Sequence, residues 1–451
     1  MDASKLTERL RGILKPPASF PPSGLPASVF GGASAADPSP SLERELGGVR
    51  VDGTASCFVV ERRVAAESFH GDARVEECAI QLERSSTRAS LLMHNEPAQS
   101  PFVFFDLETT GLSGGAGTYA FLIGCGWFSD DGSFVTRQYF LVEHGGERSM
   151  LQALADQFDR AGVLVSFNGK SFDAPLLETR YLFHRLEWRG GERPHLDLLH
   201  PARRFWGGAV DESGCSLGAL ERKLVRVHRR ADVPGYEIPA RYFQFIRGGD
   251  ARLLSAVFEH NRQDLLSLAV LTARLLQLVD SGSGATADVR EALALGHVYA
   301  NSGLDGRARE AYRRAVALTS GTREEPTATT LGIAALRGSA LAERRARAYD
   351  EAAVCWQRLL DLPGCPPHVA GEALEALAIH HEHRARDLAK AKAFALRSVE
   401  HESRPSWNDA ARHRLARLDK KLRRLNEPLL FPFSSLQLSF GSPTSARRTS
   451  S

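Results

Sequence analysis

Two acidic side chains stand one residue apart at the end of an apolar run. The run at 102–105 leads into Asp106, Leu107 and Glu108, and a Thr-Thr-Gly turn follows at 109–111. On a strand, residues i and i+2 point to the same face, so Asp106 and Glu108 should emerge side by side. Paired carboxylates repel each other unless a cation lies between them, and hard oxygen ligands suit Mg²⁺ or Mn²⁺. A solvated strand end has the same pattern, so the interpretation depends on further ligands.

Two other segments offer such ligands. Asp173 lies at a predicted strand-to-helix junction, and His260 and Asp264 share one face of a helix predicted over 252–279, because positions i and i+4 are one turn apart. If that helix crosses the sheet near the strand ends, four carboxylates converge. Such a set holds two divalent cations ~3.5–4 Å apart, the arrangement that cleaves phosphodiesters. His260 would then take the proton from the attacking water as general base.

The surrounding elements predict how these residues are positioned. Three strands joined by short turns form an antiparallel meander, and helices and strands alternate after it, which predicts a mixed sheet with flanking helices in the order of a ribonuclease-H-like α/β fold. The predicted strands are 103–106, 119–127, 134–141, 163–166 and one that ends at 195–199; the predicted helices are 147–161, 175–186 and 252–279. Residues 57–72 and 76–93 predict a lead-in hairpin.

Three motifs in this order resemble those of the DEDD exonuclease superfamily. They are Asp106-Leu107-Glu108-Thr109, Asn168-(x)₃-Phe172-Asp173-Ala174-Pro175 and His260-(x)₃-Asp264, and the segments at 197–204 and 216–221 narrow the resemblance to the YprB-like ribonuclease-H-like proteins. The resemblance spans about 100–278. It implies a 3′→5′ exonuclease on single-stranded DNA or RNA that uses two Mg²⁺ or Mn²⁺ ions, with Asp106, Glu108, Asp173 and Asp264 as metal ligands and His260 as catalytic partner.

The third motif departs from the family pattern. The tyrosine-type branch has Tyr-(x)₃-Asp and the histidine-type branch has His-(x)₄-Asp, whereas here a histidine stands at the tyrosine-type spacing. The alternative for His260 is a helix histidine bonded to solvent or to Glu259. For Asp264 the alternative is weaker, because a carboxylate between apolar neighbours is costly to bury without a partner.

The residues predicted to contact substrate carry weaker sequence signals than the acids. The turn at 109–117 is the predicted lip where a chain end enters, although its glycines also fit a flexible hairpin. Phe172 and Leu112 would wedge against terminal bases or, for Phe172, lie in the core; Asn168 would position substrate or hold its turn. The predicted substrate-binding residues are Thr109, Gly111, Leu112, Asn168 and Phe172. Basic residues able to contact phosphates, or simply exposed helical arginines, are Arg203, Arg204, Arg222, Lys223, Arg226, Arg229 and Arg230.

The totals favour a soluble multidomain protein. A chain of 451 residues predicts two or three domains, and a net charge of +3 implies no nucleic-acid partner by itself. The six cysteines lie far apart without a Cys-x-x-Cys pair, which argues against a zinc knuckle or a disulfide framework and fits a reducing cytoplasm. No signal-like start and no apolar run of ~20 residues is present, so we expect no membrane span and a cytoplasmic location.

Composition shifts predict the domain boundaries. They are a flexible arm at 1–48 with a short helix at 6–14, the nuclease-like domain at 49–279 with its core at 100–279, a linker at 280–287, helical repeats at 288–425 with a basic capping helix at 412–425, and a disordered tail at 426–451. The repeats resemble tetratricopeptide units, which predicts an all-α domain with a protein partner; the alternative is an irregular bundle. Six positions carry that resemblance: Leu295, Gly296, Tyr299, Ala308, Tyr312 and Ala315.

The sequence therefore leaves three functions open. The first is the metal-dependent exonuclease described above. The second is a non-catalytic nucleic-acid-binding or scaffold protein that acts through its helical repeats, which the complete set of acids disfavours. The third is a structure-specific endonuclease that uses the same metals.

Overall fold

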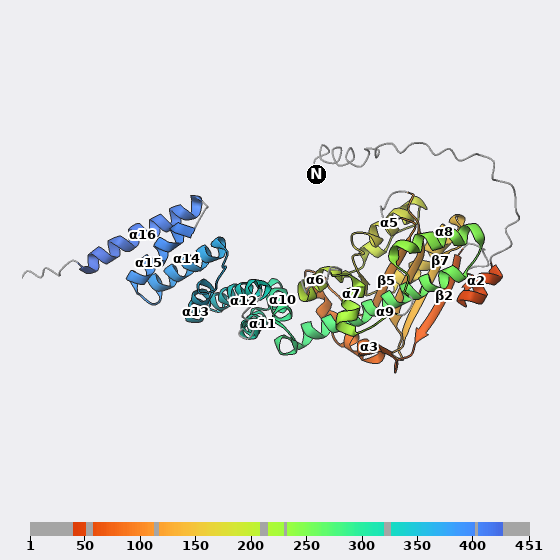
Figure 1. The fold of residues 1–451 in the computed structure, drawn as a ribbon, viewed down its shortest axis with the longest axis horizontal. Helices are drawn as coiled ribbons and strands as arrows, with labels where there is room; N and C mark the ends of the chain where they lie inside the picture. Colours follow the sequence, from red (N-terminus) through yellow and green to blue (C-terminus); the bar gives the residue numbers. More distant parts are fainter. Residues whose placement is uncertain are drawn as a thin grey trace, which may run out of the picture.

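The computed structural model describes residues 39–50, 57–111, 117–207, 215–229, 232–319, 326–401 and 405–426. A domain built on a sheet lies at one end of an elongated molecule, and a row of helices extends from it (Figure 1). The predicted helix at 6–14, residue Leu112, residue Arg230 and the predicted tail from 427 onward lie outside the described residues.

The sheet has seven strands in the order β1-β2-β7-β6-β5-β8-β9. Strands β2, β7, β6 and β5 pair antiparallel, while β8 pairs parallel with β5 and β9 with β8, so the predicted mixed sheet is confirmed. In chain order the strands are β1 (Val49–Arg50), β2 (Cys57–Val64), β5 (Phe102–Thr109), β6 (Ala120–Phe128), β7 (Phe134–Leu141), β8 (Val163–Ser166) and β9 (His195–Asp197).

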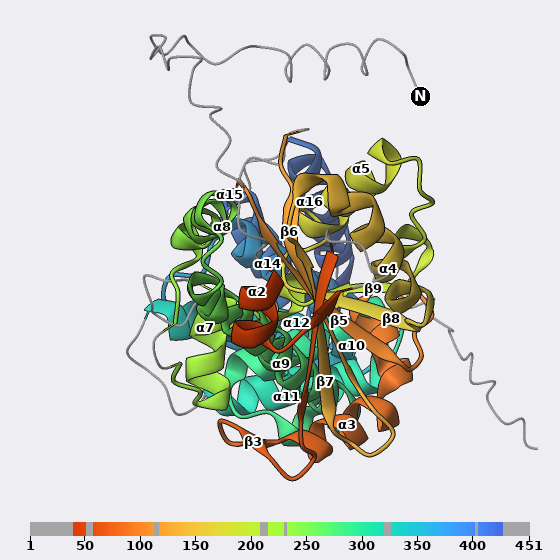
Figure 2. The same cartoon turned by 90° about the vertical axis from the view of Figure 1, so that its right-hand side faces the viewer.

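Alternate residues of β5 face two different hydrophobic cores. Phe102 and Phe104 pack in the cluster formed with α3 (Val75–Arg84), α6 (Leu199–Trp206) and most of α9 (Arg252–Ser281). Val103 and Phe105 pack with α4 (Glu147–Asp159) and α5 (Asp173–Phe183) on the opposite face. Figure 2 shows α4 and α5 on one side of the twisted sheet and α3 and α9 on the other. By the two-residue period of a strand, Asp106 therefore points to the side of α9.

Helix α9 connects the sheet domain to the helical region. Its 30 residues run beneath β5, and its second half, from Leu265 onward, is buried almost all round. The segment predicted as a linker, 280–287, is a short ordered connection: Tyr299 Oη donates to the Val279 carbonyl at 2.7 Å, and Asp280 accepts from Arg88 Nε at 3.2 Å. Among the described helices, none is long and apolar enough to cross a membrane.

Seven consecutive helices form the C-terminal region, which confirms the predicted all-helical character. Tyr312 packs between Gly296 and Gly338, where an added Cβ would lie 2.5 Å from its ring. In the last helix Leu418 is buried but Leu425 is 71% exposed, so the predicted apolar stripe is only partly used. The helices are α10 (Val289–Asn301), α11 (Asp305–Thr319), α12 (Pro326–Arg345), α13 (Tyr349–Leu360), α14 (Pro367–His383), α15 (Leu388–His401) and α16 (Pro405–Asn426).

Two expectations near the N-terminus differ from the structure. The predicted hairpin of 57–72 with 76–93 is wrong, because β2 pairs with β7 and the second segment forms α3 followed by η1 (Ser86–Leu92). Val75, Cys78 and Leu82 recur at helical spacing and are buried on one face of α3. Helix α2 (Ser39–Leu46) occupies the end of the predicted arm, and its Leu42 and Leu46 are buried four residues apart.

A buried histidine predicts how the fold responds to acid. His70 Nε2 lies 2.7 Å from Ser267 Oγ of α9, and burial lowers the pKa of His70 from 6.5 to about 4. Between these two values the unfolded chain takes up a proton that the folded chain does not, so stability falls as the pH drops from about 6.5 towards 4. We expect a loss of about 2 kcal/mol at pH 5 from this group alone, measured by denaturant titration at pH 7 and pH 5.

The variant His70→Gln keeps a hydrogen-bonding partner for Ser267 and should flatten that pH dependence. His228→Gln, at an exposed histidine, is the control and should leave it unchanged. An equally steep fall in stability in His70→Gln would contradict the assignment.

Candidate active site

The end of β5 presents two carboxylates on the side of α9. Asp106 and Glu108 keep partial exposure, whereas Leu107 between them is buried in the opposite core. The pairing of β5 with β6 shifts register between Glu108 and Thr109, so the regular ladder ends where the acids emerge. Thr109 Oγ1 donates to the Gly111 carbonyl at 3.0 Å and so holds the turn that follows β5. Thr109 and Gly111, both predicted to bind substrate, therefore stabilise this turn in the structure.

A polar clamp fixes α9 against β5 at this point. Asn261 is fully buried, and its Nδ2 donates to Asp106 Oδ2 at 2.9 Å and to the Asp106 carbonyl at 3.3 Å. Its Oδ1 accepts from Gln138 Nε2 of β7 at 2.9 Å. Gly124 of β6 makes room for this contact, since an added Cβ would lie 2.1 Å from Asn261 Oδ1. The clamp sets the height of α9 over the strand ends.

One turn of α9 carries His260 and Asp264, with 3.5 Å between His260 Nε2 and Asp264 Oδ2. His260 Nδ1 lies 2.7 Å from Asp232 Oδ1. The alternative that paired His260 with Glu259 is wrong, because Glu259 accepts from Arg262 and Gln263 instead. The imidazole is therefore held between two carboxylates.

Arg229 neutralises part of this acidic group. Its guanidinium donates to Asp264 Oδ1, to Glu221 Oε2 at 2.6 Å, and lies 3.5 Å from Asp232 Oδ2. Its side chain is only 9% exposed, and Glu221 is 1% exposed. The interpretation of Arg229 as a phosphate contact is therefore wrong for this structure: it is an internal counter-charge.

Asp173 begins α5 and approaches the group from the carboxyl end of β8. Burial, and next the charge of Asp197, raise the pKa of Asp173 to about 7. Asp197 is itself buried and accepts from the backbone N–H groups of Asn168 at 2.7 Å and Lys170 at 3.1 Å. It thereby fixes the turn that precedes Asp173, in which Asn168 has a φ of +69°. Phe172 is 59% exposed, so it is not a core residue.

The four predicted carboxylates act on one another electrostatically. Burial raises the pKa of Asp106 well above its usual value, and Asp264, Glu108 and Asp173 raise it further. Burial, Asp264 and Asp173 do the same for the pKa of Glu108, and burial raises that of Asp264 against the opposing effect of Arg229. Three separate segments thus place Glu108, Asp173 and Asp264 within electrostatic reach of Asp106, with His260 next to Asp264.

The chemistry of this donor set fits a hard divalent cation. Buried like charges are unfavourable without a counter-charge, and no described cationic side chain forms an ion pair with Asp106, Glu108 or Asp173. As they stand, the described residues include no group of three His, Cys, Asp or Glu side chains already arranged to hold an ion. Asp264 is engaged by Arg229, which an ion at this carboxylate would have to share or replace.

Several supporting residues were not predicted. Gln138 carried a signal, because it is a polar residue among the buried positions of a strand. Asn261 stands beside His260 in the third motif, and Asp197 ends a predicted strand. Arg229 and Asp232 lie in a segment without regular periodicity, so their partners follow only from the tertiary fold.

Substituting Gly124 tests the clamp. In Gly124→Ala the new methyl group would meet Asn261 Oδ1 at 2.1 Å and Leu265 Cδ1 at 2.9 Å, so we expect a loss of at least about 1–3 kcal/mol in unfolding free energy. Gly306→Ala in α11 is the control, because nothing lies within 4 Å of its added Cβ, and it should be neutral or slightly stabilising. Denaturant titrations compare the two; similar values would argue against the clamp.

Comparison with known proteins places the chain in a family. Residues 103–276, the segment that carries all four carboxylates, match the RNase_H superfamily. A curated relative, an uncharacterized protein YprB from Bacillus subtilis (strain 168), is 32% identical over 322 residues, which cover 70% of this chain and 74% of the relative. That similarity extends well beyond the sheet domain. The chain therefore belongs to the YprB family, and it carries an RNase_H superfamily domain.

Proposed function

We propose that this protein is a metal-dependent 3′→5′ exonuclease that hydrolyses phosphodiester bonds of single-stranded DNA or RNA. The observation that carries the proposal is the convergence of four carboxylates, from β5, α5 and α9, beside His260. Membership of the RNase_H superfamily supports nuclease chemistry. The exonuclease type and its polarity rest on the resemblance of the three motifs to those of the DEDD superfamily.

In this proposal Asp106, Glu108, Asp173 and Asp264 hold two Mg²⁺ or Mn²⁺ ions. Bound there, the cations supply Lewis-acid stabilisation of the developing charge and lower the pKa of the attacking water. The protein contributes a fixed acceptor set. Asn261 orients the carboxylate of Asp106, and Asp197 orients the turn that delivers Asp173.

His260 serves as the proton acceptor in this proposal. With Nδ1–H donated to Asp232 Oδ1, the unprotonated nitrogen is Nε2, the one that faces Asp264. A carboxylate that holds an imidazole in one tautomer supports general-base catalysis by its other nitrogen. Asp232 is thus a positioning residue in the proposal.

Substrate contacts follow from what borders the acids. Phe172 is exposed directly beside Asp173 and offers a face on which a terminal base can stack. Asn168 and the turn at 109–111 line the same end of the sheet. The helical region would add a protein partner through tetratricopeptide-like units, a proposal supported by the packing of Tyr312 on Gly296 and Gly338.

The direct test is Asp106→Asn with end-labelled single-stranded DNA and RNA and Mg²⁺ or Mn²⁺. Replacing one carboxylate oxygen by an amide removes a charged ligand, so we expect cleavage to fall by a factor of about 10³ or more. Asp350→Asn, at a side chain that is 91% exposed on α13, is the matched control and should retain full activity.

Product patterns then separate the enzyme classes. Stepwise release of mononucleotides from the 3′ end supports the exonuclease. Cleavage of circular strands would assign the same acids to an endonuclease, and binding without cleavage under either metal would favour the scaffold function.

Cation binding should also be visible without turnover. An ion bound only by the folded protein stabilises it by RT ln(1 + [L]/Kd), about 2.7 kcal/mol at 100 times Kd. We expect Mn²⁺ to raise the melting temperature of the parent protein and of Asp350→Asn but not of Asp106→Asn. In EDTA we expect Asp106→Asn to have a higher melting temperature than the parent protein, because the substitution removes one of several repelling charges. An equal response of all three proteins to Mn²⁺ would argue against an ion at Asp106.

A further inference from the structure

Exposed cations without partners gather on two neighbouring elements. Arg203 and Arg204 lie on the exposed side of α6, and Arg222 and Lys223 on the short π-helical turn η4 (Glu221–Val225). None of these four side chains forms an ion pair with a described residue. The neighbouring Arg226 differs, since it lies 3.3 Å from Asp72. The basic residues described between 203 and 229 therefore comprise the internal Arg229, the exposed but paired Arg226, and four exposed cations without an ion pair to a described residue.

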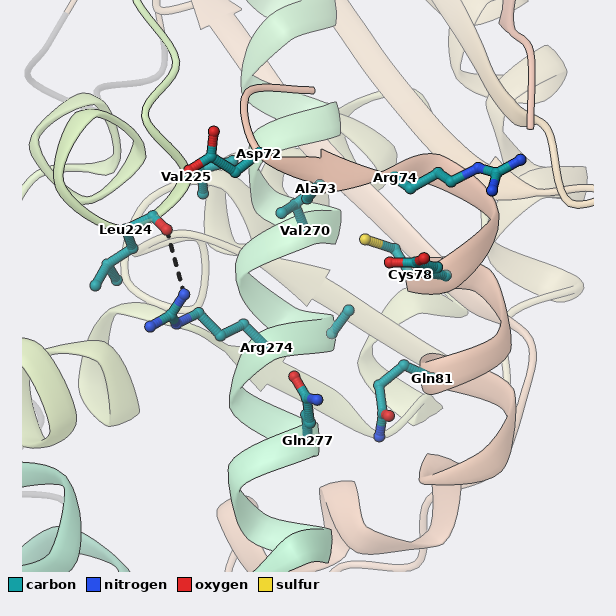
Figure 3. Close-up of a pocket in the computed structure, with 12 residues that line it drawn as sticks. Asp72, Ala73, Arg74, Cys78, Gln81, Leu224, Val225, Val270, Arg274 and Gln277 are labelled. Atoms are coloured by element: carbon teal, nitrogen blue, oxygen red, sulfur yellow. Dashed lines mark hydrogen bonds between the residues drawn. The ribbon is translucent and has the colours of Figure 1, made fainter. Parts of the chain in front are cut away.

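The turn η4 is anchored next to the acids. Its first residue, Glu221, accepts from Arg229, whose guanidinium also contacts Asp264. On its other side η4 borders a cavity of about 300 Å³ between α3 and α9, where Arg274 of α9 donates to the Leu224 carbonyl at 3.3 Å (Figure 3). Arg222 and Lys223 thus lie on a turn that is fixed at both sides, and they directly follow Glu221, which binds the same arginine as Asp264.

The unpaired cations continue from η4 to α6. The thiol of Cys215 lies within electrostatic reach of both Arg203 and Lys223, which oppose the effect of burial on its pKa. Arg203 of α6 and Lys223 of η4 thus both lie near Cys215, although they belong to different elements. Both side chains are exposed and form no ion pair within the part of the chain that the structure describes, and both conditions suit a phosphate-binding surface.

From α6 the positive charge passes to the helical region. Trp206 Nε1 donates to Glu291 Oε1 of α10 at 3.0 Å, so α6 packs directly on α10, and Figure 1 shows α10 between α6 and α12. Burial lowers the pKa of His297 of α10, and the charge of Arg204 lowers it further. The His297 ring lies 5.7 Å from that of Tyr312. On α12, Arg345 is exposed and forms no ion pair with a described residue, and its charge opposes the effect of burial on the pKa of Tyr312.

We propose that Arg222, Lys223, Arg203, Arg204 and Arg345 form one basic track that binds the phosphates of a single-stranded nucleic acid whose 3′ end lies at the four carboxylates. The proposal rests on the nuclease function proposed above. It adds that the first helices of the C-terminal region belong to the substrate-binding surface. Acidic side chains repel a phosphodiester chain, and a row of unpaired cations next to them offsets that repulsion.

The spacing of the elements sets the length of strand required. Packed helices lie about 8–10 Å apart, so the three steps from η4 to α6, α10 and α12 cover roughly 25 Å. A short oligonucleotide at the acids reaches only the cations of η4. A longer strand also reaches Arg204 and Arg345, and its binding should be more sensitive to salt.

The test measures binding by fluorescence anisotropy in EDTA, with labelled single strands of about 2 and about 30 nucleotides. The variant is Arg204→Ala/Arg345→Ala. Two exposed arginines, one directly after α4 and one on α13, provide the matched control, Arg160→Ala/Arg358→Ala. For the long strand we expect about tenfold weaker binding in the track variant and a smaller salt slope, by about 0.7 for each cation removed, with no change for the short strand. Arg204→Lys/Arg345→Lys should restore most of the affinity.

Equal weakening by the control variant, or no weakening by the track variant, would overturn the proposal. So would equally strong competition by polyglutamate, because it would assign the track to an acidic protein. Cleavage of the short strand by the parent protein serves as the separate readout of the nuclease function. If the parent cleaves no strand, the nuclease function fails, and the length-dependent binding still decides whether the track binds nucleic acid.

Discussion

Repulsion between carboxylates is the constraint on which the sheet domain depends. Burial raises the pKa values of Asp106 and Glu108, and the charges of Asp264 and Asp173 raise both further, so gathering these acids costs free energy that the surrounding fold must offset. Asn261 does so by a hydrogen bond to Asp106, Arg229 by its charge on Asp264, and Asp197 indirectly by holding the turn before Asp173. Each supporting residue belongs to a different segment, so the acids stay together only while the whole sheet domain is folded.

Patterns within single elements were predictable from the sequence. The strands at 134–141 and 163–166 were predicted with the observed bounds, and α9 ends two residues beyond the predicted 279, because long apolar runs and helical periodicity are local properties. The four carboxylates and His260 were identified by residue type and spacing. Their positions next to one another needed the topology, which the order of strands and helices indicated.

Contacts between distant segments were not predictable in the same way. Residues 76–93 contain a short stretch that alternates between apolar and polar residues, yet Val75, Cys78 and Leu82 bury a helical face against α9. Nothing in the order of residues distinguishes Arg229 from its exposed neighbours Arg226 and Arg222. The distinction arises from Glu221, Asp232 and Asp264, which lie up to 35 residues away in the chain. The predicted basic cluster therefore combined one internal counter-charge, Arg229, with surface cations such as Arg222 and Arg226.

The ordered connection after α9 has a consequence for how the protein unfolds. Residues of the sheet domain and of α10–α14 belong to one continuous hydrophobic cluster, and Trp206 and Tyr299 close the joint from either side. A change in composition along the chain thus does not coincide with a break in cooperativity. Damage to one of these helices would propagate through α9 to the strand ends, and the sheet domain cut away from its helices would expose a large apolar surface.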